Sequence, residues 1–286
     1  MHRALAKIAS AIAALVVFFV TPAALAQNVS LTPTRVVLGD RDRAAEVLIL
    51  NQSSSPVTYR IDLSEKHMTE TGELQAYDDQ HQAPANWPSA AAYLRFAPRE
   101  VTLQPGQSQS VRIAVRRPPD LADGEYRSHM TVTALPAATE AGESVESAAG
   151  AGNQGDVRIR LTPIYGVSIP VIMRVGAPAA QSQLANPHLV ATPDGGRAMQ
   201  VDIQRSGNAS VYGDLEVDWR ANGRDQRVGL IRGVAVYPEI SHRTVTIALD
   251  LQSLRSAAGG VTVVRYVDNA TAANEVVLAE VQGPGL

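Results

Sequence analysis

Apolar and polar residues alternate along most of the chain, and the longest such run lies at residues 156–176, DVRIRLTPIYGVSIPVIMRVG. Every odd position in it from Val157 to Val175 is apolar, and most even positions are polar or glycine. A period of two predicts a β-strand with one buried face. Strands usually have about 3–10 residues. Either something unusual covers this apolar face, or the run is two ordinary strands in one core, divided at Pro163 or Gly166.

Shorter alternating runs, separated by turn residues, occupy the rest of the chain. Before the long run they are VSLTPTRVVL, AAEVLILNQSSSPVTYRIDLSE, YLRFAPREVTLQPGQSQSVRIAV and GEYRSHMTVTALP. After it they are HLVATP, RAMQVDIQRSG, YGDLEVDWRANG, RVGLIRGVAVYP, RTVTIALDL, GGVTVVRYVDN and EVVLAEVQ. Short strands at this spacing, with little helical periodicity, predict an all-β fold made of sandwiches.

Composition divides the chain into two predicted domains. The segment VGAPAAQ at 175–181 has the composition of a linker. It separates a first domain, residues 27–176, from a second domain, residues 177–286, which has the size of an immunoglobulin-like sandwich. Residues 137–156 are mainly Ala, Gly, Ser, Glu and Gln, so we expect a mobile loop there, followed by a long edge strand at 157–175.

The amino terminus predicts export. Arg3 and Lys7 precede an apolar run at residues 8–20, and Ala24-Leu25-Ala26 has the small-x-small pattern of a cleavage site. This is the pattern of a secretory signal peptide, residues 1–26, although a retained anchor is the alternative. We therefore expect an exported mature protein that starts near Gln27.

Charge and cysteine content narrow the function further. The formal net charge is −3, and removal of Arg3 and Lys7 with the leader makes the mature chain more acidic. This argues against nucleic acid as the main partner. There is no cysteine, so two apolar cores must stabilise the exported chain without disulfides.

Signatures of catalysis are missing from the sequence. The histidines after the leader are scattered, without the spacing of metal ligands, and there is no nucleophile elbow or phosphate loop. Glu65-Lys66-His67 is predicted to be a solvated turn, and Asp78-Asp79 lies in a polar loop. We therefore expect no enzyme activity, no cofactor, no metal and no small-molecule substrate.

Several phrases, in their order, resemble the PapD-like periplasmic chaperones of the chaperone–usher pilus pathway. VSLTPTRVVL resembles the first strand of that family, FAPREVTLQPGQSQSVRIAV resembles a later hairpin, and DGEYRSHMTVTALP resembles the strand before the variable loop. The resemblance covers residues 29–176 well and the remainder mainly in architecture. It implies two immunoglobulin-like β-sandwich domains with an interdomain cleft.

The resemblance also implies a use for the long strand. Such a chaperone lends an edge strand to a pilus or fimbrial subunit that lacks its last strand, and an outer-membrane usher receives the subunit. The carboxyl half, Val167 to Val175, would then belong to this protein's own core. The donated half would place apolar side chains in the subunit: Val157, Ile159, Leu161, Pro163 and Tyr165.

Arg35 is the implied anchor for the terminal carboxylate of the subunit. The alternative is an arginine that only extends its charged end from a strand into water. The family pairs this arginine with a lysine, whose place here falls near Pro170, so Arg174 or Arg160 is the candidate for the second base. Arg174 also matches a family arginine that ties the domains together.

The sequence therefore predicts a periplasmic subunit chaperone. Two other classes stay open. One is a structural or adhesive exported protein whose long strand is wholly internal. The other is an enzyme or metal-binding module, which would gather polar residues at one end of a sandwich.

Overall fold

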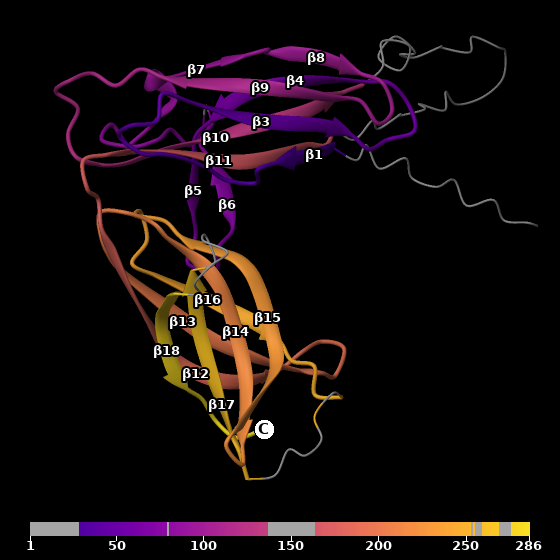
Figure 1. Cartoon of the computed structure of the whole chain (residues 1–286), viewed down its shortest axis with the longest axis vertical. Helices are drawn as coiled ribbons and strands as arrows, with labels where there is room; N and C mark the ends of the chain where they lie inside the picture. The colour runs from indigo at the N-terminus through magenta and orange to yellow at the C-terminus, as the bar shows by residue number, and fades with distance from the viewer. Residues whose placement is uncertain (1–28, 79, 137–163, 253, 255–258, 269–275) are drawn as a thin grey trace, which may run out of the picture.

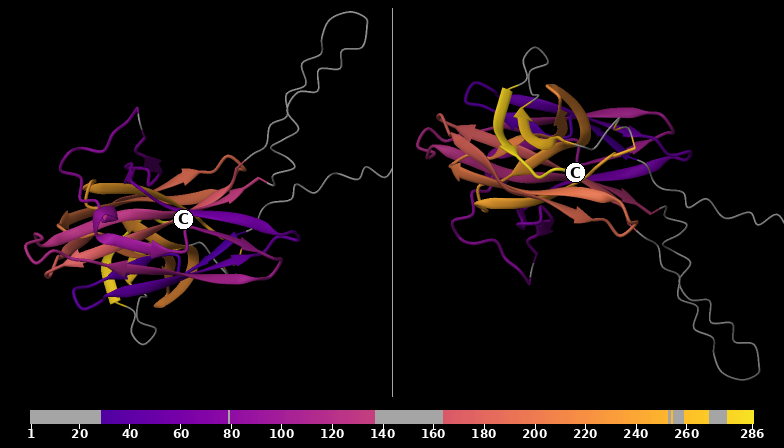
Figure 2. Two further views of the ribbon diagram at one scale, coloured as in Figure 1. Left: turned by 90° about the horizontal axis from the view of Figure 1, so that it is seen from above. Right: turned by 90° about the horizontal axis from the view of Figure 1, so that it is seen from below.

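In the described residues the regular secondary structure is almost entirely β-strand, arranged in two sandwiches that are set at an angle (Figure 1). The structure is a computed structural model and describes residues 29–78, 80–136, 164–252, 254, 259–268 and 276–286. Seen from above, the first sandwich lies in front of the second, and from below the order is reversed (Figure 2). The predicted all-β, two-sandwich fold is confirmed.

The first sandwich has two sheets that face each other. One sheet has the order β1-β3-β9-β7 and the other β2-β11-β10-β4-β8, in which β2 and β11 are parallel. The strands are β1 (Val29–Thr32), β2 (Val36–Leu38), β3 (Ala44–Asn51), β4 (Val57–Ser64), β7 (Leu94–Ala97), β8 (Glu100–Leu103), β9 (Ser108–Val115), β10 (Gly124–Leu135) and β11 (Gly166–Val175). A short 3-10 helix, η1 (Ala91–Tyr93), precedes β7.

The second sandwich follows after a short connection. Its sheets have the orders β12-β13-β16 and β15-β14-β17-β18. The strands are β12 (Ala180–Ala191), β13 (Arg197–Gly207), β14 (Val211–Ala221), β15 (Arg224–Val236), β16 (His242–Ala248), β17 (Val261–Asp268) and β18 (Val276–Gln282). The two sandwiches therefore use separate stretches of the chain.

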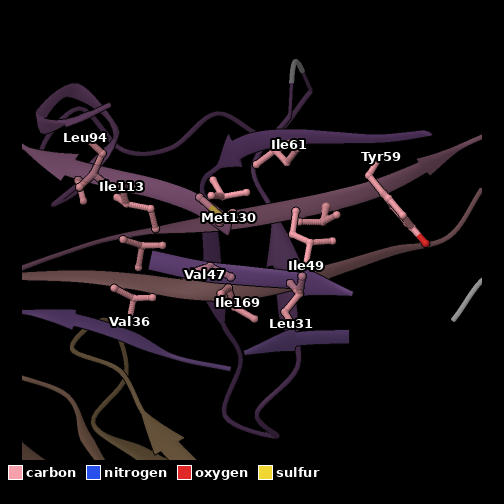
Figure 3. Close-up of a cluster of buried hydrophobic side chains, with 14 of the residues drawn as sticks. Leu31, Val36, Val47, Ile49, Tyr59, Ile61, Leu94, Ile113, Met130 and Ile169 are labelled. Atoms are coloured by element: carbon pink, nitrogen blue, oxygen red, sulfur yellow. The ribbon is translucent and has the colours of Figure 1, made fainter. Parts of the chain in front are cut away.

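Alternation along the strands builds each core. In β3, Val47 and Ile49 are buried between the sheets, whereas Leu48 points to the outer face. Figure 3 shows such inward side chains meeting from both sheets of the first sandwich. The second sandwich has its own apolar cluster, with Trp219 and Tyr266 among the large members. Burial in two separate cores is how a chain without disulfides stays folded.

The first predicted strand, residues 29–38, is in fact two strands in different sheets. β1 pairs with β3 in one sheet, and β2 pairs with β11 in the other. Pro33, between them, cannot donate a backbone hydrogen bond, so the ladder breaks there and the chain crosses over. The crossing changes which positions face inward: Val36 and Leu38 are buried, whereas Val37, which has the parity of Val29 and Leu31, is 41% exposed.

A hairpin of the first domain reaches the second domain (Figure 1). It consists of β5 (Lys66–Met68) and β6 (Leu74–Ala76). Its turn packs on the second domain so closely that a Cβ added at Gly72 would lie 2.2 Å from the Arg243 guanidinium. The backbone amide of Thr244 donates to the carbonyl oxygen of Glu70 at 2.9 Å. The hairpin is thus a bridge between the domains.

The prediction of a solvated turn at residues 65–67 was wrong. The Glu65 carboxylate accepts hydrogen bonds from the indole of Trp87 at 2.8 Å and from the hydroxyls of Ser89 and Ser128 at 2.8 and 2.6 Å. His67 lies against the ring of Tyr77, with centroids 4.8 Å apart. Three polar residues in sequence gave no sign of these partners, which are distant along the chain.

Adjacent residues of β3 test this description of the fold. Ile49 is fully buried and Leu48 is 43% exposed on the opposite face. Ile49→Ala should lower the free energy of unfolding by about 2–5 kcal/mol, because it leaves a cavity between the sheets. Leu48→Ala should cost less than about 1 kcal/mol. Urea unfolding measures both, and equal losses would contradict the assigned faces.

Candidate functional site

β11 has an edge that is only partly covered. β10 pairs with it along its whole length, from Thr133 opposite Gly166 to Gly124 opposite Val175. On the other side β2 reaches only Val171 to Met173. Within the residues that the structure describes, no strand covers that side between Gly166 and Pro170. Pro170, which lacks an amide hydrogen, is compatible with this position.

Apolar side chains leave the core toward the amino-terminal end of β11. Ile169, Val171 and Met173 are buried in the first sandwich. Val167 and Tyr165 have the same parity, yet they are 38% and 52% exposed. Core burial therefore begins at Ile169, two residues later than the expected Val167. Pairing with β10 continues to the residue before β11, since the amide of Ala134 donates to the carbonyl oxygen of Tyr165 at 2.9 Å.

The other predicted donor residues and one candidate base are not among the described residues. Val157, Ile159, Leu161, Pro163 and Arg160 all belong to the undescribed range 137–163, as does the expected loop at 137–156. Their roles stay predictions. Ile164, the first described residue after the gap, is 62% exposed.

Arg35 lies between the two domains. Its Nη2 donates to the hydroxyl oxygen of Ser210 at 3.0 Å, and its guanidinium lies over the ring of Tyr212, 4.5 Å from the centroid. Its Nη1 is buried and has no hydrogen-bond partner in the described structure. Burial lowers the pKa of the guanidinium, while Tyr237 and Glu125 act in the opposite direction. The sequence had singled out this arginine, but its second-domain partners were not visible there.

Arg174, the other described candidate for a base, is engaged with Glu125. The two side chains form an ion pair at 3.2 Å, and the Glu125 carboxylate is fully buried. Glu125 also accepts hydrogen bonds from the amide and hydroxyl of Ser210, at 3.0 and 2.9 Å. Arg174, Glu125, Ser210 and Arg35 thus form one network across the domains. In this network Arg174 is a structural contact between the domains.

A second contact between the domains centres on Arg127. Its guanidinium is nearly buried and makes a two-pronged ion pair with Glu239 of the second domain, at 2.6 and 3.1 Å. It also donates to the carbonyl oxygen of Lys66 in the hairpin and lies 3.7 Å from the centroid of the Tyr237 ring. Glu239 accepts a further hydrogen bond from the amide of Met68 at 2.9 Å. One buried pair therefore connects β10, the hairpin and the second domain.

His129 is buried beside this pair. Its side chain is inaccessible, and neither ring nitrogen has a hydrogen-bond partner among the described residues. Its ring meets that of Tyr237 edge-on, with centroids 6.3 Å apart. Burial, together with the nearby cations Arg127 and Lys66, lowers the pKa of His129 to about 3. A neutral imidazole is therefore part of the contact between the domains.

The described residues hold no group of three or more histidine, cysteine or acidic side chains arranged to bind a metal ion. No helix in the same residues is long and apolar enough to cross a membrane.

Removing Glu239 should destabilise the protein strongly. Glu239→Ala leaves the Arg127 guanidinium buried without its counter-charge, which costs about 3–5 kcal/mol. The matched control is Glu100→Ala, because the Glu100–Arg60 pair is about half exposed and should contribute at most about 1 kcal/mol. Urea unfolding, followed by circular dichroism, compares the two. Equal losses would show that the buried pair does not hold the domains.

The lowered pKa of His129 should make the protein less stable in acid. The unfolded chain takes up a proton near the ordinary pKa of 6.5, whereas the folded chain does so only near 3. Between these values the unfolded state binds more protons, so the free energy of unfolding falls as the pH falls from 6.5 toward 3. His129→Phe keeps an aromatic ring and removes this contribution.

The comparison is made as a difference between variants, because carboxylates also titrate in this range. We expect wild type and His129→Phe to differ little at pH 7.5, and the wild type to lose more stability than the variant by pH 4.5. The control for loss of a histidine is His81→Gln at an exposed position, which should change the free energy of unfolding by no more than about 0.5 kcal/mol. A constant difference between wild type and His129→Phe would contradict the assignment.

Comparison with known proteins gives structural likeness and no sequence match. No family model matches the chain, and no curated protein matches it either. Among solved structures it is similar to the CupB2 chaperone of Pseudomonas aeruginosa, with 13% identity and a TM-score of 0.43, covering 90% of this chain and 100% of that one. The chaperone YadV is 10% identical with a TM-score of 0.43, covering 90% of this chain and 98% of that one.

A third similar structure is a complex of CsuC and CsuE from the archaic chaperone–usher Csu pili of Acinetobacter baumannii. It has 12% identity and a TM-score of 0.42, covering 88% of this chain and 98% of the matched one. Each of these three chaperone structures covers 88–90% of this chain.

Proposed function

We propose that this protein is a periplasmic chaperone that binds and caps pilus or fimbrial subunits by lending them an edge strand, and delivers them to an outer-membrane usher. The signal-peptide pattern supports the location. The usher and the subunit class follow from the sequence resemblance. No catalytic step is needed, because binding energy from the lent strand supports folding of the subunit.

The observation that carries the proposal is the partly covered edge of β11. From Gly166 to Pro170 one side of the strand is left uncovered by the described strands, so its backbone groups on that side are available to another chain. Strand addition uses such an edge: backbone hydrogen bonds give affinity, and alternate side chains fill pockets of the partner.

The side chains at that end of β11 have the matching chemistry. Tyr165 and Val167 are exposed although the same apolar alternation continues into the core at Ile169, and Ile164 on the opposite parity is exposed as well. Moving one large apolar side chain from water into a groove stabilises a complex by about 1.5–3 kcal/mol before ordering costs. The same alternation extends to Val157 in the sequence, which gives Ile159, Leu161 and Pro163 the same proposed role.

Arg35 adds a point of attachment at the domain contact. Its unpartnered Nη1 can donate to an anionic group, and a charge-assisted hydrogen bond to a carboxylate is stronger than a neutral one. We therefore assign Arg35 to the terminal carboxylate of the subunit. Such an anchor would fix the register in which the lent strand enters the subunit.

Co-export tests the proposal. The chain is expressed with exported proteins encoded nearby that lack the last strand of an immunoglobulin-like fold, and complexes are isolated by a tag on this chain. We expect a one-to-one complex with the wild type and its loss in Ile159→Asp/Leu161→Asp, because two carboxylates cannot enter an apolar groove without a large penalty.

The matched control is Leu48→Asp, which places the same charge on an exposed apolar position of β3, away from β11. This variant should retain the subunit. A wild-type chain that remains alone with every candidate subunit would refute strand lending and favour an exported structural protein. Retention of the subunit by the double variant would refute the assignment of residues 157–165.

A further inference from the structure

The second domain places a tyrosine beside Arg35. Ser210, whose hydroxyl accepts the Arg35 hydrogen bond, comes directly before β14, and β14 begins its pairing with Val211 opposite Val236. The next position across this pair, opposite Ser210, is Tyr237. The Arg35 guanidinium lies over the ring of Tyr212, and Tyr212 packs against the apolar cluster that contains Tyr237. Tyr237, which directly follows β15, therefore lies close to Arg35.

The Tyr237 ring is held firmly while its hydroxyl is free. The ring lies under the Arg127 guanidinium and meets His129 edge-on. It also packs in a small apolar cluster with Met68 and Ile172, which come from the first domain. In the described part of the chain its hydroxyl makes no hydrogen bond, and the residue is only 3% exposed. The hydroxyl is not one of the fully buried polar atoms that lack a partner, so a ligand that accepts its hydrogen bond can reach it.

The charged side chains around Arg35 also favour binding of an anion. Two guanidinium groups, those of Arg35 and Arg174, are arranged around the single carboxylate of Glu125 through Ser210. Arg127 next to them is neutralised by Glu239. The network around Ser210 thus has two positive side chains and one negative side chain. Its net charge is positive, and Nη1 of Arg35 has no hydrogen-bond partner. Uncompensated positive charge in a buried place favours a negative ligand.

We propose that Tyr237 is the second hydrogen-bond donor of a carboxylate site whose first donor is Arg35, so that both domains hold one ligand. One carboxylate oxygen would accept from Nη1 of Arg35 and the other from the Tyr237 hydroxyl. The identity of the ligand as the terminal carboxylate of a subunit rests on the proposed function. Arg174 then keeps its place in the network and does not contact the ligand.

The inference can be tested without a subunit. The probes are N-acetyl-valyl-valine as the free acid and the same dipeptide as its amide. The mature protein carries ¹⁵N-labelled arginine and tyrosine labelled with ¹³C at Cζ, so NMR reports Arg35 and Tyr237 separately. We expect the acid to shift the signals of both residues in a saturable way, and the amide to leave them in place.

Tyr237→Phe provides the decisive comparison. It keeps the aromatic ring between Arg127 and His129, so the fold should be retained, and the melting temperature verifies this. Loss of a hydrogen bond to a charged group should weaken binding of the acid about tenfold or more. Tyr93→Phe is the control, because Tyr93 packs in the core of the first sandwich, and its affinity should equal that of the wild type.

Several outcomes would overturn the inference. They are equal binding of acid and amide, an unchanged affinity in Tyr237→Phe, and a Tyr237 signal that stays in place while Arg35 shifts. None of these affects strand lending, which is judged by the co-export experiment. If co-export fails and the dipeptide acid still binds through both residues, the carboxylate site stands and only the proposed ligand is wrong.

Discussion

The buried ion pair between Arg127 and Glu239 is the contact on which the arrangement of the two domains depends. Both side chains are largely buried, so water solvates neither charge well and each charge is stabilised mainly by the other. The hairpin residues Lys66 and Met68 contribute backbone groups to the same pair. Because the pair lies next to Tyr237 and His129, its geometry also fixes the surface that the second domain turns toward Arg35. A chain without disulfides thus uses buried polar contacts to set an orientation that two apolar cores alone would leave open.

Much of the fold followed from the alternation of apolar and polar residues, because a half-buried strand needs only local information to be identified. The turn between β8 and β9 also depends on local residues: the amide of Gln107 donates to the carbonyl oxygen of Gln104, and Gly106 has φ +75°, where glycine is favoured. The crossover at Pro33 was missed, since alternation continues across it in the sequence while the strand changes sheets. Arg35 follows this crossover and donates a hydrogen bond to Ser210, a residue far away in the chain.

The site residues were predictable to different degrees for the same reason. In the sequence, Tyr165 stands out as an apolar position in a long alternating run, and Arg35 stands out as a charge within an apolar alternation. Glu125, Ser210 and Tyr237 carry no comparable signal, because each is an ordinary residue of a strand or turn until the second domain packs on the first. The sequence could identify Arg174 as a candidate base, but it could not give its role, because the ion pair with Glu125 forms only in the folded protein. A sequence shows the type of each residue, but it does not show which distant residues that side chain contacts.

The two halves of β11 have opposite requirements, and the domain contact reconciles them. Its carboxyl-terminal half must be rigid, because Ile169, Val171 and Met173 complete the core and Ile172 packs toward Tyr237. Its amino-terminal end must stay open if it is to pair with another chain. A strand can be anchored at one end and available at the other only when the anchored end is held from both faces. In this protein the first core holds one face and the second domain holds the other, so the position of the second domain determines where the available edge begins.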